Sequence, residues 1–400
     1  MTMKYLYVPL IGLGTLLATG CGGNSNMATL PPTGPACVAS PTPEFSYALT
    51  GYSVSMFSVN SCTGQFSATT PSSIATGYAT PQANSEEMVT DPRGRFAYVA
   101  NLVSNASDLS TISMYTINST TGVLSPTTPA TVHTGWYPQE IAIDPLGRFV
   151  YTANSDDNSI SMFTINQSTG VLTPTTPASA STVVPGNVLW QPSFLTVDPT
   201  GKFLYLTESL TNGAAILMFS IDQTTGVLSP TSPATVSVGG WPWQVVVAPS
   251  GKFAYVVNNF SDGSMADGVW QYNVESATGV LTASAPAAVA AGNGPTGIAV
   301  DPTSKFAYVV NRHDNTVSMY TIDPNSGNLT LNTARSATGV ISTGTGTEPF
   351  RISFDPSGKF LYVANEAGPA SIFTVNNDGT LTSVGTTAGS SLAIAFTKPK

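Results

Sequence analysis

The chain has 400 residues, of which 42% are hydrophobic and only 9% are charged, and it carries a formal net charge of −9 with two histidines. A chain of this kind can bury a large core, while its acidity excludes electrostatic attraction to nucleic acid and disfavours polyanionic partners. Thr, Val, Tyr and Phe are plentiful, whereas the helix-favouring Glu, Lys and Arg are scarce. This composition indicates many short strands joined by turns, for which 36 Gly and 30 Pro are available.

Residues 1–20 have the features of a secretion signal. Lys4 precedes an apolar run from Tyr5 to Ala18 that is too short to span a membrane comfortably. The run ends in small residues before Cys21, which resembles a bacterial lipoprotein signal with its lipobox, although Ala18 stands where Leu is commoner. The resemblance implies cleavage before Cys21 and acylation of its thiol, hence a lipid-anchored protein of the bacterial cell envelope, facing the periplasm or the surface. An ordinary secretory peptide or a membrane anchor is the alternative.

Residues 21–43 are rich in Gly, Asn, Thr and Pro, which is typical of a flexible tether. Cys37 and Cys62 remain as an even pair in an oxidising compartment, which favours a disulfide over two buried thiols. With two histidines and no CxxC pair, we expect no metal site. We expect a monomer.

The rest of the chain, residues 44–400, repeats one phrase. D-P-x-G-[RK]-F-x-Y or a close variant begins at residues 91, 144, 198, 248, 301 and 355, and Phe45-Ser46-Tyr47 supplies a seventh F-x-Y. A second marker, a T-G or similar turn, also occurs seven times, from Thr63-Gly64 to Asp378-Gly379. Each unit reads as four strands, a to d, with the D-P-x-G turn between a and b. Four-stranded units at this period predict an all-β, seven-bladed β-propeller.

The two ends of the repeated region predict how the ring closes. The first unit has no strand a, while the run "SSLAIAF" at residues 390–396 ends the chain where a strand a would stand. We therefore expect the C-terminal strand to complete blade 1, which removes a free sheet edge.

The sequences "YVAN", "YTAN" and "YVVN" after the turn resemble the YVTN repeats of the lactonase-like β-propeller family, which includes 6-phosphogluconolactonases. The resemblance covers residues 44–396 and implies the fold and, at the family level, lactone hydrolysis. The enzymes' H-x-H-like pair is replaced by Tyr137 and Gln139, and one basic residue is missing at "QPSFLTVDP". Arg351 is present but displaced by one position, and Asn365-Glu366 is kept.

Function is expected where the copies differ. The d–a loops and b–c loops should form one funnel, opposite the D-P-x-G turns, whose recurring basic residues we interpret as solvated turn charges. Four of the five tryptophans, Trp136, Trp190, Trp241 and Trp243, are expected in the d–a loops, where aromatic residues bind sugars or peptides, or pack between loops. His133, at the end of a strand d, is expected at the periphery. The candidates for ligand binding are Trp136, Tyr137, Trp190, Trp241, Trp243, Gln244, Arg312, His313, Phe350 and Glu366.

Four residues before each turn Asp lies one equivalent position, which should converge on the centre of the ring. It holds Glu87, Glu140, Phe194, Gln244, Gly297, Arg351 and Ala393. Glu87 and Glu140 are candidates for an acid/base pair, and Arg351 for neutralising them or binding a substrate carboxylate. A structural Glu–Arg pair would use the same residues.

The sequence lacks a nucleophile motif and a phosphate- or dinucleotide-binding fingerprint, so we expect no cofactor. Three functions remain open: a binding protein for a small carbohydrate-like or peptide ligand, a lactone hydrolase, and a scaffold for protein interactions.

Overall fold

The structure, a computed structural model, describes residues 37, 40, 42–77, 83–103, 110–183, 192–210, 213–259, 267–390 and 393–397. The chain divides into two units, Met1–Val38 and Ala39–Lys400. The signal, Cys21 and Trp190 lie outside the described residues. Cys37 and Cys62 are both disulfide-bonded. Within the described ranges there is no helix of the length and apolar character needed to cross a membrane.

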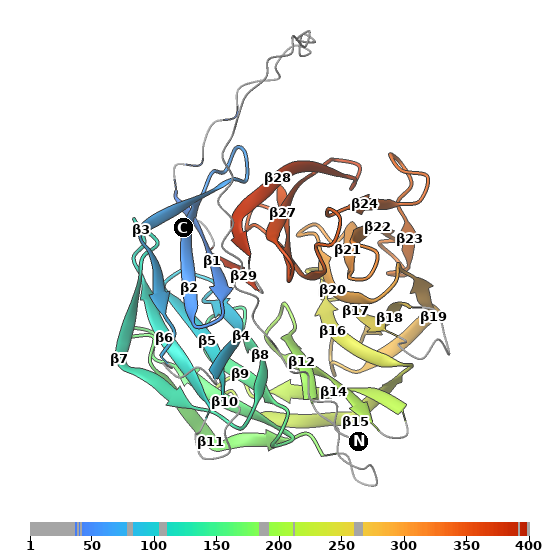
Figure 1. Ribbon diagram of the computed structural model, residues 1–400. Coiled ribbons are helices and arrows are strands. Elements are labelled where there is room, and N and C mark those ends of the chain that lie inside the picture. Colours follow the sequence, from blue (N-terminus) through green and yellow to red (C-terminus); the bar gives the residue numbers. More distant parts are fainter. Residues whose placement is uncertain are drawn as a thin grey trace, which may run out of the picture. The chain divides into compact units, whose positions relative to one another are not determined.

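The described part of the second unit consists of strands arranged in seven sheets, which we number as blades 1 to 7 (Figure 1). Blade 1 has the order β29-β1-β2-β3, and blades 2 to 5 are β4–β7, β8–β11, β12–β15 and β16–β19. Blade 6 is β20–β24, in which β23 and β24 both pair with β22, and blade 7 is β25–β28. The fold is therefore the predicted seven-bladed propeller, closed by the C-terminal strand.

The strand bounds are as follows: β1 (Glu44–Thr50), β2 (Ser53–Val59), β3 (Phe66–Ala75), β4 (Ala83–Thr90), β5 (Phe96–Val103), β6 (Thr111–Ile117), β7 (Leu124–His133), β8 (Pro138–Ile143), β9 (Phe149–Asn154), β10 (Ser159–Ile165), β11 (Leu172–Ser181), β12 (Pro192–Val197), β13 (Phe203–Leu210), β14 (Gly213–Ile221), β15 (Leu228–Val238), β16 (Trp241–Val247), β17 (Phe253–Asn259), β18 (Gly268–Val274), β19 (Leu281–Ala290), β20 (Pro295–Val300), β21 (Phe306–Asn311), β22 (Thr316–Ile322), β23 (Leu329–Leu331), β24 (Val340–Ser342), β25 (Pro349–Phe354), β26 (Phe360–Asn365), β27 (Pro369–Val375), β28 (Leu381–Ser390) and β29 (Ile394–Phe396).

The D-P-x-G turn is held by its aspartate. In blade 4, Oδ1 of Asp198 accepts hydrogen bonds from the backbone amides of Lys202 and Phe203, both at 2.8 Å. The Asp side chain is buried, so these amides take the place of water. In the blades that contain this aspartate, the turn therefore connects the first strand to the second with its polar groups satisfied.

The two sequence markers meet at every joint between neighbouring blades. The tyrosine of F-x-Y donates a hydrogen bond to the carbonyl of the turn glycine in the next blade, as from Tyr98 to Gly170 at 2.9 Å. The phenylalanine lies under the same glycine, where an added Cβ would come within 2.4 Å of the Phe96 ring. The joint between blades 7 and 1 is built in the same way, with Tyr362 donating to Gly64 at 2.7 Å. The ring therefore closes through the contact that forms its other joints.

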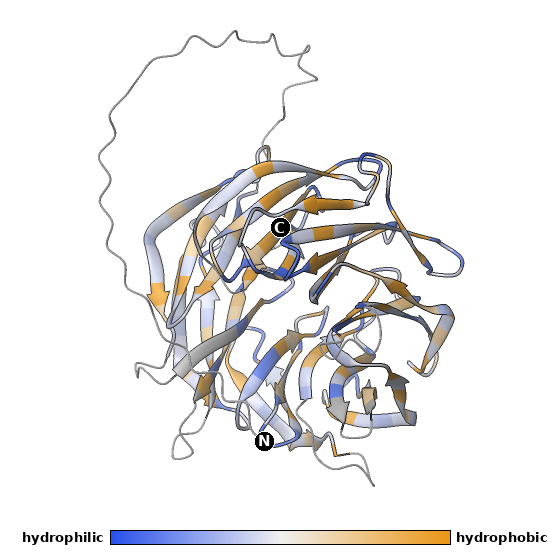
Figure 2. Ribbon diagram, turned by 45° about the vertical axis from the view of Figure 1, so that its right-hand side comes forward, coloured by the Kyte–Doolittle hydropathy of each residue, from blue (hydrophilic) through white to orange (hydrophobic). Residues whose placement is uncertain are grey.

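The hydrophobic core lies between the blades. Clusters of buried residues combine side chains from adjacent sheets, such as Tyr151 of blade 3 with Leu204 and Leu206 of blade 4. Figure 2 shows apolar residues recurring along the strands, interleaved with polar ones. The methionines of the third strands are buried at the joints, where Met114 Sδ, for example, accepts a hydrogen bond from the Leu172 amide. Burial on both sheet faces explains this stripe.

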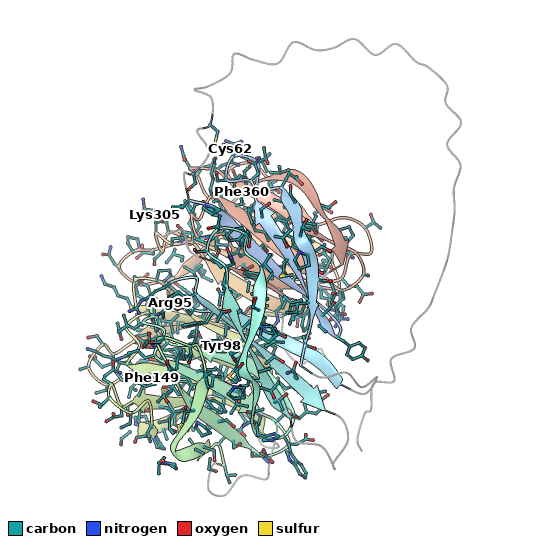
Figure 3. All side chains as sticks on the ribbon, turned by 90° about the vertical axis from the view of Figure 1, so that its left-hand side faces the viewer. Cys62, Arg95, Tyr98, Phe149, Lys305 and Phe360 are labelled. Carbon is teal, nitrogen blue, oxygen red and sulfur yellow. The ribbon has the colours of Figure 1, made fainter. Side chains whose placement is uncertain are left out.

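The basic residues after the turns were expected to be solvated, but not all of them are. Arg95 is only 24% exposed: its Nη2 lies 2.8 Å from Asp91 Oδ2, and its Nη1 donates to the Gln167 carbonyl of the next blade. Arg148 forms the equivalent contacts. The lysine at the same position of blade 6, Lys305, is exposed, and Figure 3 shows it along the same side of the molecule as Arg95. The expectation is wrong for the two arginines, because their planar guanidinium groups can bridge two partners.

Candidate functional site

The predicted ring position lies in or directly before the innermost strand of each blade, and it carries a side chain in every blade except blade 6, where it is Gly297. A register shift precedes it in several blades, between Ser85 and Glu87, between Pro138 and Glu140, and between Pro349 and Arg351. Such a bulge turns the following side chain away from the regular alternation of the strand. The first strands of successive blades also contact one another around the ring. The side chains at this position are therefore presented to its centre.

Arg351 reaches across the ring from blade 7 to blades 2 and 3. Its Nη2 atom lies 2.9 Å from Oε2 of Glu87 and 3.1 Å from Oε2 of Glu140. The three side chains are between 12% and 13% exposed, so water screens these ion pairs only weakly. We call these residues the Glu–Arg–Glu cluster. It joins blade 7 to blades 2 and 3, which are not neighbours of blade 7 in the ring.

Two aromatic rings hold the guanidinium group of Arg351 in place. Its Cζ atom lies 4.5 Å from the ring centroid of Phe194 and 5.4 Å from that of Phe350. Phe194 is buried and comes from blade 4, at the ring position next to Glu140. These contacts favour a cation over a ring face and fix the direction in which Arg351 points.

The two carboxyl groups of the cluster differ in their electrostatics. Burial raises the pKa of Glu140 from 4.5 to about 8, although Arg351 lowers it, and the negative charge of Glu87 raises it further. Oε2 of Glu140 is buried and has no hydrogen-bond partner of good geometry, despite its proximity to Arg351. Glu87 differs in that its Oε1 accepts a hydrogen bond from the Met88 amide. At neutral pH the cluster can therefore offer one protonated carboxyl group beside one arginine.

A second charged group lies beside Phe350. Nη2 of Arg312 lies 3.0 Å from Glu348 Oε2 and also contacts Glu366 Oε2. The Cζ atom of Arg312 is 5.9 Å from the Phe350 centroid. We call Arg312, Glu348 and Glu366 the Arg312 cluster. Because both arginines contact Phe350, the two clusters are neighbours.

An aromatic group connects blades 4, 5 and 7 at this site. The ring of Trp243 lies 5.6 Å from that of Phe194 and 5.7 Å from that of Phe350. Trp241 is 49% exposed, and Trp136, preceding blade 3, is 43% exposed. Both Trp241 and Trp243 were expected in a loop, but they belong to β16, because that strand begins with the pairing of Trp241 with Asn259.

The other predicted residues have different surroundings. Oε1 of Gln244 accepts a hydrogen bond from the Ile298 amide at 2.8 Å, so this side chain braces blade 5 against blade 6. His313 is exposed, with its Nδ1 3.4 Å from Asn293 Oδ1. Tyr137 and Glu348 have positive φ angles. Glu348 was missed by sequence reasoning, although its place directly before Pro349 matches that of Tyr137 before Pro138.

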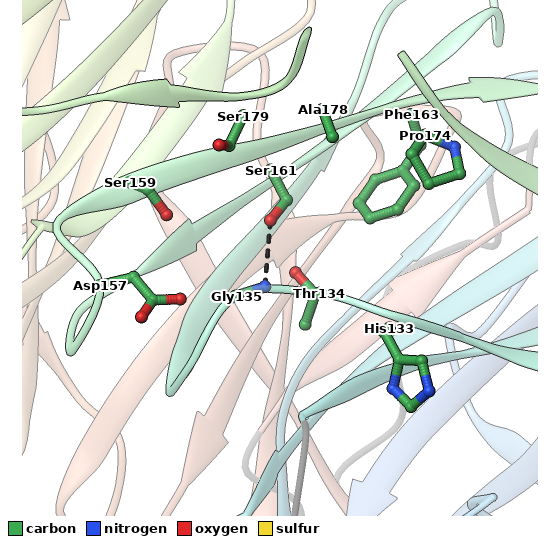
Figure 4. A pocket seen from close by; sticks show the side chains of 10 residues that line it. All are labelled: His133, Thr134, Gly135, Asp157, Ser159, Ser161, Phe163, Pro174, Ala178 and Ser179. Carbon is green, nitrogen blue, oxygen red and sulfur yellow. Dashed lines mark hydrogen bonds between the residues drawn. The ribbon is translucent and has the colours of Figure 1, made fainter. Parts of the chain in front are cut away.

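A cavity of about 250 Å³ lies elsewhere, between the outer strands of blades 2 and 3. Figure 4 shows His133 and Asp157 on opposite sides of it, and the Gly135 amide donates a 3.1 Å hydrogen bond to Ser161 Oγ. A Cβ at Gly135 would come within 2.5 Å of Asp157 Oδ2, so this close approach needs glycine. The cavity contains no residue of either charged cluster.

One more buried carboxyl group stands apart from the clusters. Glu208 occupies the position at the end of the second strand where blades 2, 3, 5, 6 and 7 have asparagine. Asn154 donates there to Ser159 and Ser161, whereas Glu208 pairs with Ala215 and its Oε2 has no hydrogen-bond partner. Burial raises the pKa of Glu208 to about 8.

Among the described residues, no group of three or more His, Cys, Asp or Glu side chains is placed to hold a metal ion. The chemistry that the cluster itself can supply is proton transfer and the stabilisation of negative charge. A protonated carboxyl, an ionisable carboxyl and an arginine can serve as general acid, general base and oxyanion stabiliser in acyl-group hydrolysis.

Comparison with known proteins agrees with this architecture. A putative 6-phosphogluconolactonase from Bacteroides fragilis is 21% identical, with a TM-score of 0.67 over 90% of this chain and 99% of that one. The periplasmic gluconolactonase PpgL from Pseudomonas aeruginosa is 17% identical, with a TM-score of 0.65 over 90% of this chain and 99% of that one. At these identities the likeness shows the fold alone. No curated protein matches the chain.

The family model described as "Lactonase, 7-bladed beta-propeller" matches residues 40–190 and 265–393, which is more than half of the chain. The matched ranges include Glu87, Glu140 and Arg351. The chain therefore belongs to the lactonase family of seven-bladed β-propellers.

Proposed function

We propose that this protein hydrolyses uncharged sugar lactones at the Glu–Arg–Glu cluster. The observation that carries the proposal is the position of Arg351, which contacts an oxygen of both Glu87 and Glu140 through one nitrogen atom. Membership of the lactonase family agrees with this reaction class.

In the proposed reaction a water molecule attacks the lactone carbonyl carbon and gives its proton to Glu87. The carbonyl oxygen becomes an oxyanion, which Arg351 stabilises. The ring C–O bond then breaks, and Glu140 donates its proton to the departing hydroxyl oxygen. Its raised pKa of about 8 keeps that proton available at neutral pH. The product is an open-chain hydroxy acid, and the reaction leaves Glu140 ionised and Glu87 protonated. Transfer of one proton from Glu87 to Glu140 then restores the starting state of the cluster.

The charges around the site favour a substrate without phosphate. Arg351 is shared between two glutamates, and Arg312 is likewise paired with Glu348 and Glu366. Binding a phosphate would require breaking these pairs, at the cost of leaving carboxylates partly buried and uncompensated. The paired arginines therefore disfavour the 6-phosphate substrates for which some of the structural neighbours are named.

The test is a hydrolysis assay on glucono-1,5-lactone and its 6-phosphate, measured as acid release above the buffer rate. We expect turnover of the neutral lactone, a loss of at least about 100-fold in kcat for Glu140→Gln and Glu87→Gln, and falling activity as the pH rises through 8. Arg335→Ala, which removes an exposed ion pair with Asp378, is the matched control and should retain wild-type activity. Wild-type turnover in Glu140→Gln would overturn the assignment.

A binding protein for a carbohydrate is the second candidate. It is favoured by the exposed Trp136 and Trp241 and by the shielding of Arg351 between two rings and two glutamates. In that case the wild-type chain would show no turnover but would bind a sugar in calorimetry, and Trp241→Ala would weaken the binding.

We also propose that the protein acts in the cell envelope, anchored by acyl chains on Cys21. The support is the sequence alone: a short apolar run followed by small residues and a cysteine. This location suits a substrate that has not been phosphorylated inside the cell.

A further inference from the structure

Within the described part of the chain, three blades have a left-handed residue directly before the proline that begins the innermost strand. These residues are Tyr137 in blade 3, Gly294 in blade 6 and Glu348 in blade 7, with φ angles of 58°, 64° and 47°. Residues with a side chain adopt this conformation at an energetic cost that glycine avoids. Glycine would therefore be the expected residue at all three positions, and Tyr137 and Glu348 need an explanation.

The loops around these residues have one common geometry. The carbonyl groups of Tyr137, Gly294 and Glu348 accept hydrogen bonds from the amides of Ser155, Arg312 and Glu366, at 3.0, 2.9 and 3.1 Å. The backbone thus imposes the same positive φ in each blade, whatever residue is present. Whether a residue larger than glycine fits at this position depends on the space that the neighbouring side chains leave.

Blade 6 shows why glycine is used there. A Cβ atom on Gly294 would lie 2.5 Å from His313 Nδ1, so the histidine occupies the space of a side chain. The residue that matches His313 in blade 7 is Ala367, which leaves room for Glu348. Space permits a side chain at this position but does not require one, because glycine would remove the strain.

The two strained residues belong to the blades that supply the site. Tyr137 lies three residues before Glu140, and Glu348 lies three residues before Arg351. In blade 6 the ring position is Gly297, which contributes no side chain to the cluster, and the left-handed residue is also glycine. At the position before the innermost strand, left-handed residues with side chains thus occur in the two blades whose ring positions carry Glu140 and Arg351, and strain of this kind is common at functional sites.

We propose that Tyr137 and Glu348 form an outer subsite that recognises a second sugar unit attached to the lactone, so that the substrate class is an oligosaccharide lactone. This inference rests on the proposed function. The Glu348 side chain is 51% exposed and held by Arg312, so its carboxylate can accept hydrogen bonds from sugar hydroxyl groups. Tyr137 follows the exposed Trp136, and aromatic faces of this kind stack on sugar rings.

The experiment compares glucono-1,5-lactone with cellobiono-1,5-lactone as substrates of the full-length chain. The variants Tyr137→Gly and Glu348→Gly remove the side chains and relieve the backbone strain. We expect the ratio of kcat/KM for the disaccharide over the monosaccharide to fall by about 10-fold or more in each variant, a typical loss for one subsite contact. The melting temperature should not fall, because the strain is relieved.

Ser304→Gly is the matched control. Ser304 has a φ of 57° and stands in a D-P-x-G-type turn where the other copies have glycine. It should leave the substrate ratio unchanged. If Tyr137→Gly and Glu348→Gly also leave the ratio unchanged while the wild type opens both lactones, the outer subsite is refuted and the proposed function stands.

If the wild type opens neither lactone, the proposed function fails and the subsite is tested by binding. Calorimetry with cellobiose, which has no lactone to open, should then detect binding to the wild type that Tyr137→Gly and Glu348→Gly weaken by about 10-fold. An absence of cellobiose binding to the wild type, or equal binding by all three proteins, would overturn the subsite.

Discussion

Replacing Arg351 by alanine tests how the centre of the ring is held together. The substitution removes a cation that lies 2.9 Å from Glu87 and 3.1 Å from Glu140 and leaves two poorly hydrated carboxyl groups facing each other. Removing one partner of a buried ion pair costs about 3–5 kcal/mol, and each lost contact with Phe194 or Phe350 costs about 0.5–1 kcal/mol. Because the site retains some exposure, we expect the free energy of unfolding to fall by about 4 kcal/mol at pH 9.

The loss should depend on pH in a direction fixed by Glu140. Its pKa is raised from 4.5 to about 8 in the folded protein, so the folded state binds this proton more tightly than the unfolded chain. The resulting stabilisation is fully present below pH 4.5 and is lost as the pH rises through 8. At pH 5 Glu140 is neutral and Arg351→Ala loses its pairing with Glu87 alone, so we expect a cost of about 2 kcal/mol.

Denaturant unfolding at pH 5 and pH 9, followed by tryptophan fluorescence, measures this difference. The matched control combines Arg351→Met with Glu87→Gln and Glu140→Gln, which keeps the side-chain volumes and removes every charge. It should recover most of the stability lost at pH 9. An equal loss at both pH values, or a triple variant as unstable as Arg351→Ala, would refute the electrostatic reasoning.

Three further expectations follow from the frame, from Glu208 and from the N-terminus. Tyr98→Phe and Tyr362→Phe should each lower the free energy of unfolding by about 1–2 kcal/mol, since each leaves a buried carbonyl unpaired; a much smaller effect for Tyr362→Phe would mean that the closing joint is weaker than the others. Glu208→Gln should raise the unfolding midpoint at pH 9 and leave it unchanged at pH 5, because burial raises the pKa of this carboxyl to about 8; equal midpoints at pH 9 would contradict its burial in charged form. Cys21→Ser should abolish the incorporation of labelled palmitate and release the protein from membranes, whereas retention of the label would exclude Cys21 as the acylated residue.

The blade count and the closure of the ring could be predicted from the sequence because each joint between blades uses two recurring sequence motifs, one from each blade. F-x-Y supplies the donor and the T-G turn supplies the acceptor, as Tyr98 and Gly170 illustrate. Each joint needs a tyrosine hydroxyl that reaches the carbonyl and a glycine at the turn, because a Cβ there would clash with the phenylalanine ring. The two motifs therefore recur together. A feature repeated for a structural reason is the kind of feature that a single sequence can reveal.

The site was less predictable, because its contacts depend on details that the repeats do not contain. Alignment of the copies placed Glu87, Glu140 and Arg351 at one ring position. The repeats do not reveal the width of the ring, so they could not show which of these side chains are long enough to meet. The Arg312 cluster depends on Glu348, whose position is set by a left-handed backbone. Similarly, the low exposure of Arg95 follows from its contact with a carbonyl of the next blade, which only the folded ring brings near.

The order of residues around the ring explains why Arg351 points to the far side of the ring. Its neighbours at the ring position are Gly297 in blade 6 and Ala393 in blade 1, the two smallest side chains of the set. Neither neighbour offers a partner or an obstacle, and the Cβ missing from Gly297 would lie only 3.0 Å from the Phe350 carbonyl. Opposite Arg351, blades 2 to 4 present two carboxyl groups and an aromatic ring in succession, which are the groups that a guanidinium contacts favourably. The similar joints make the backbone ring nearly symmetric. The asymmetry that forms a site comes from the side chains, because one large cation between two small residues contacts the blades on the opposite side.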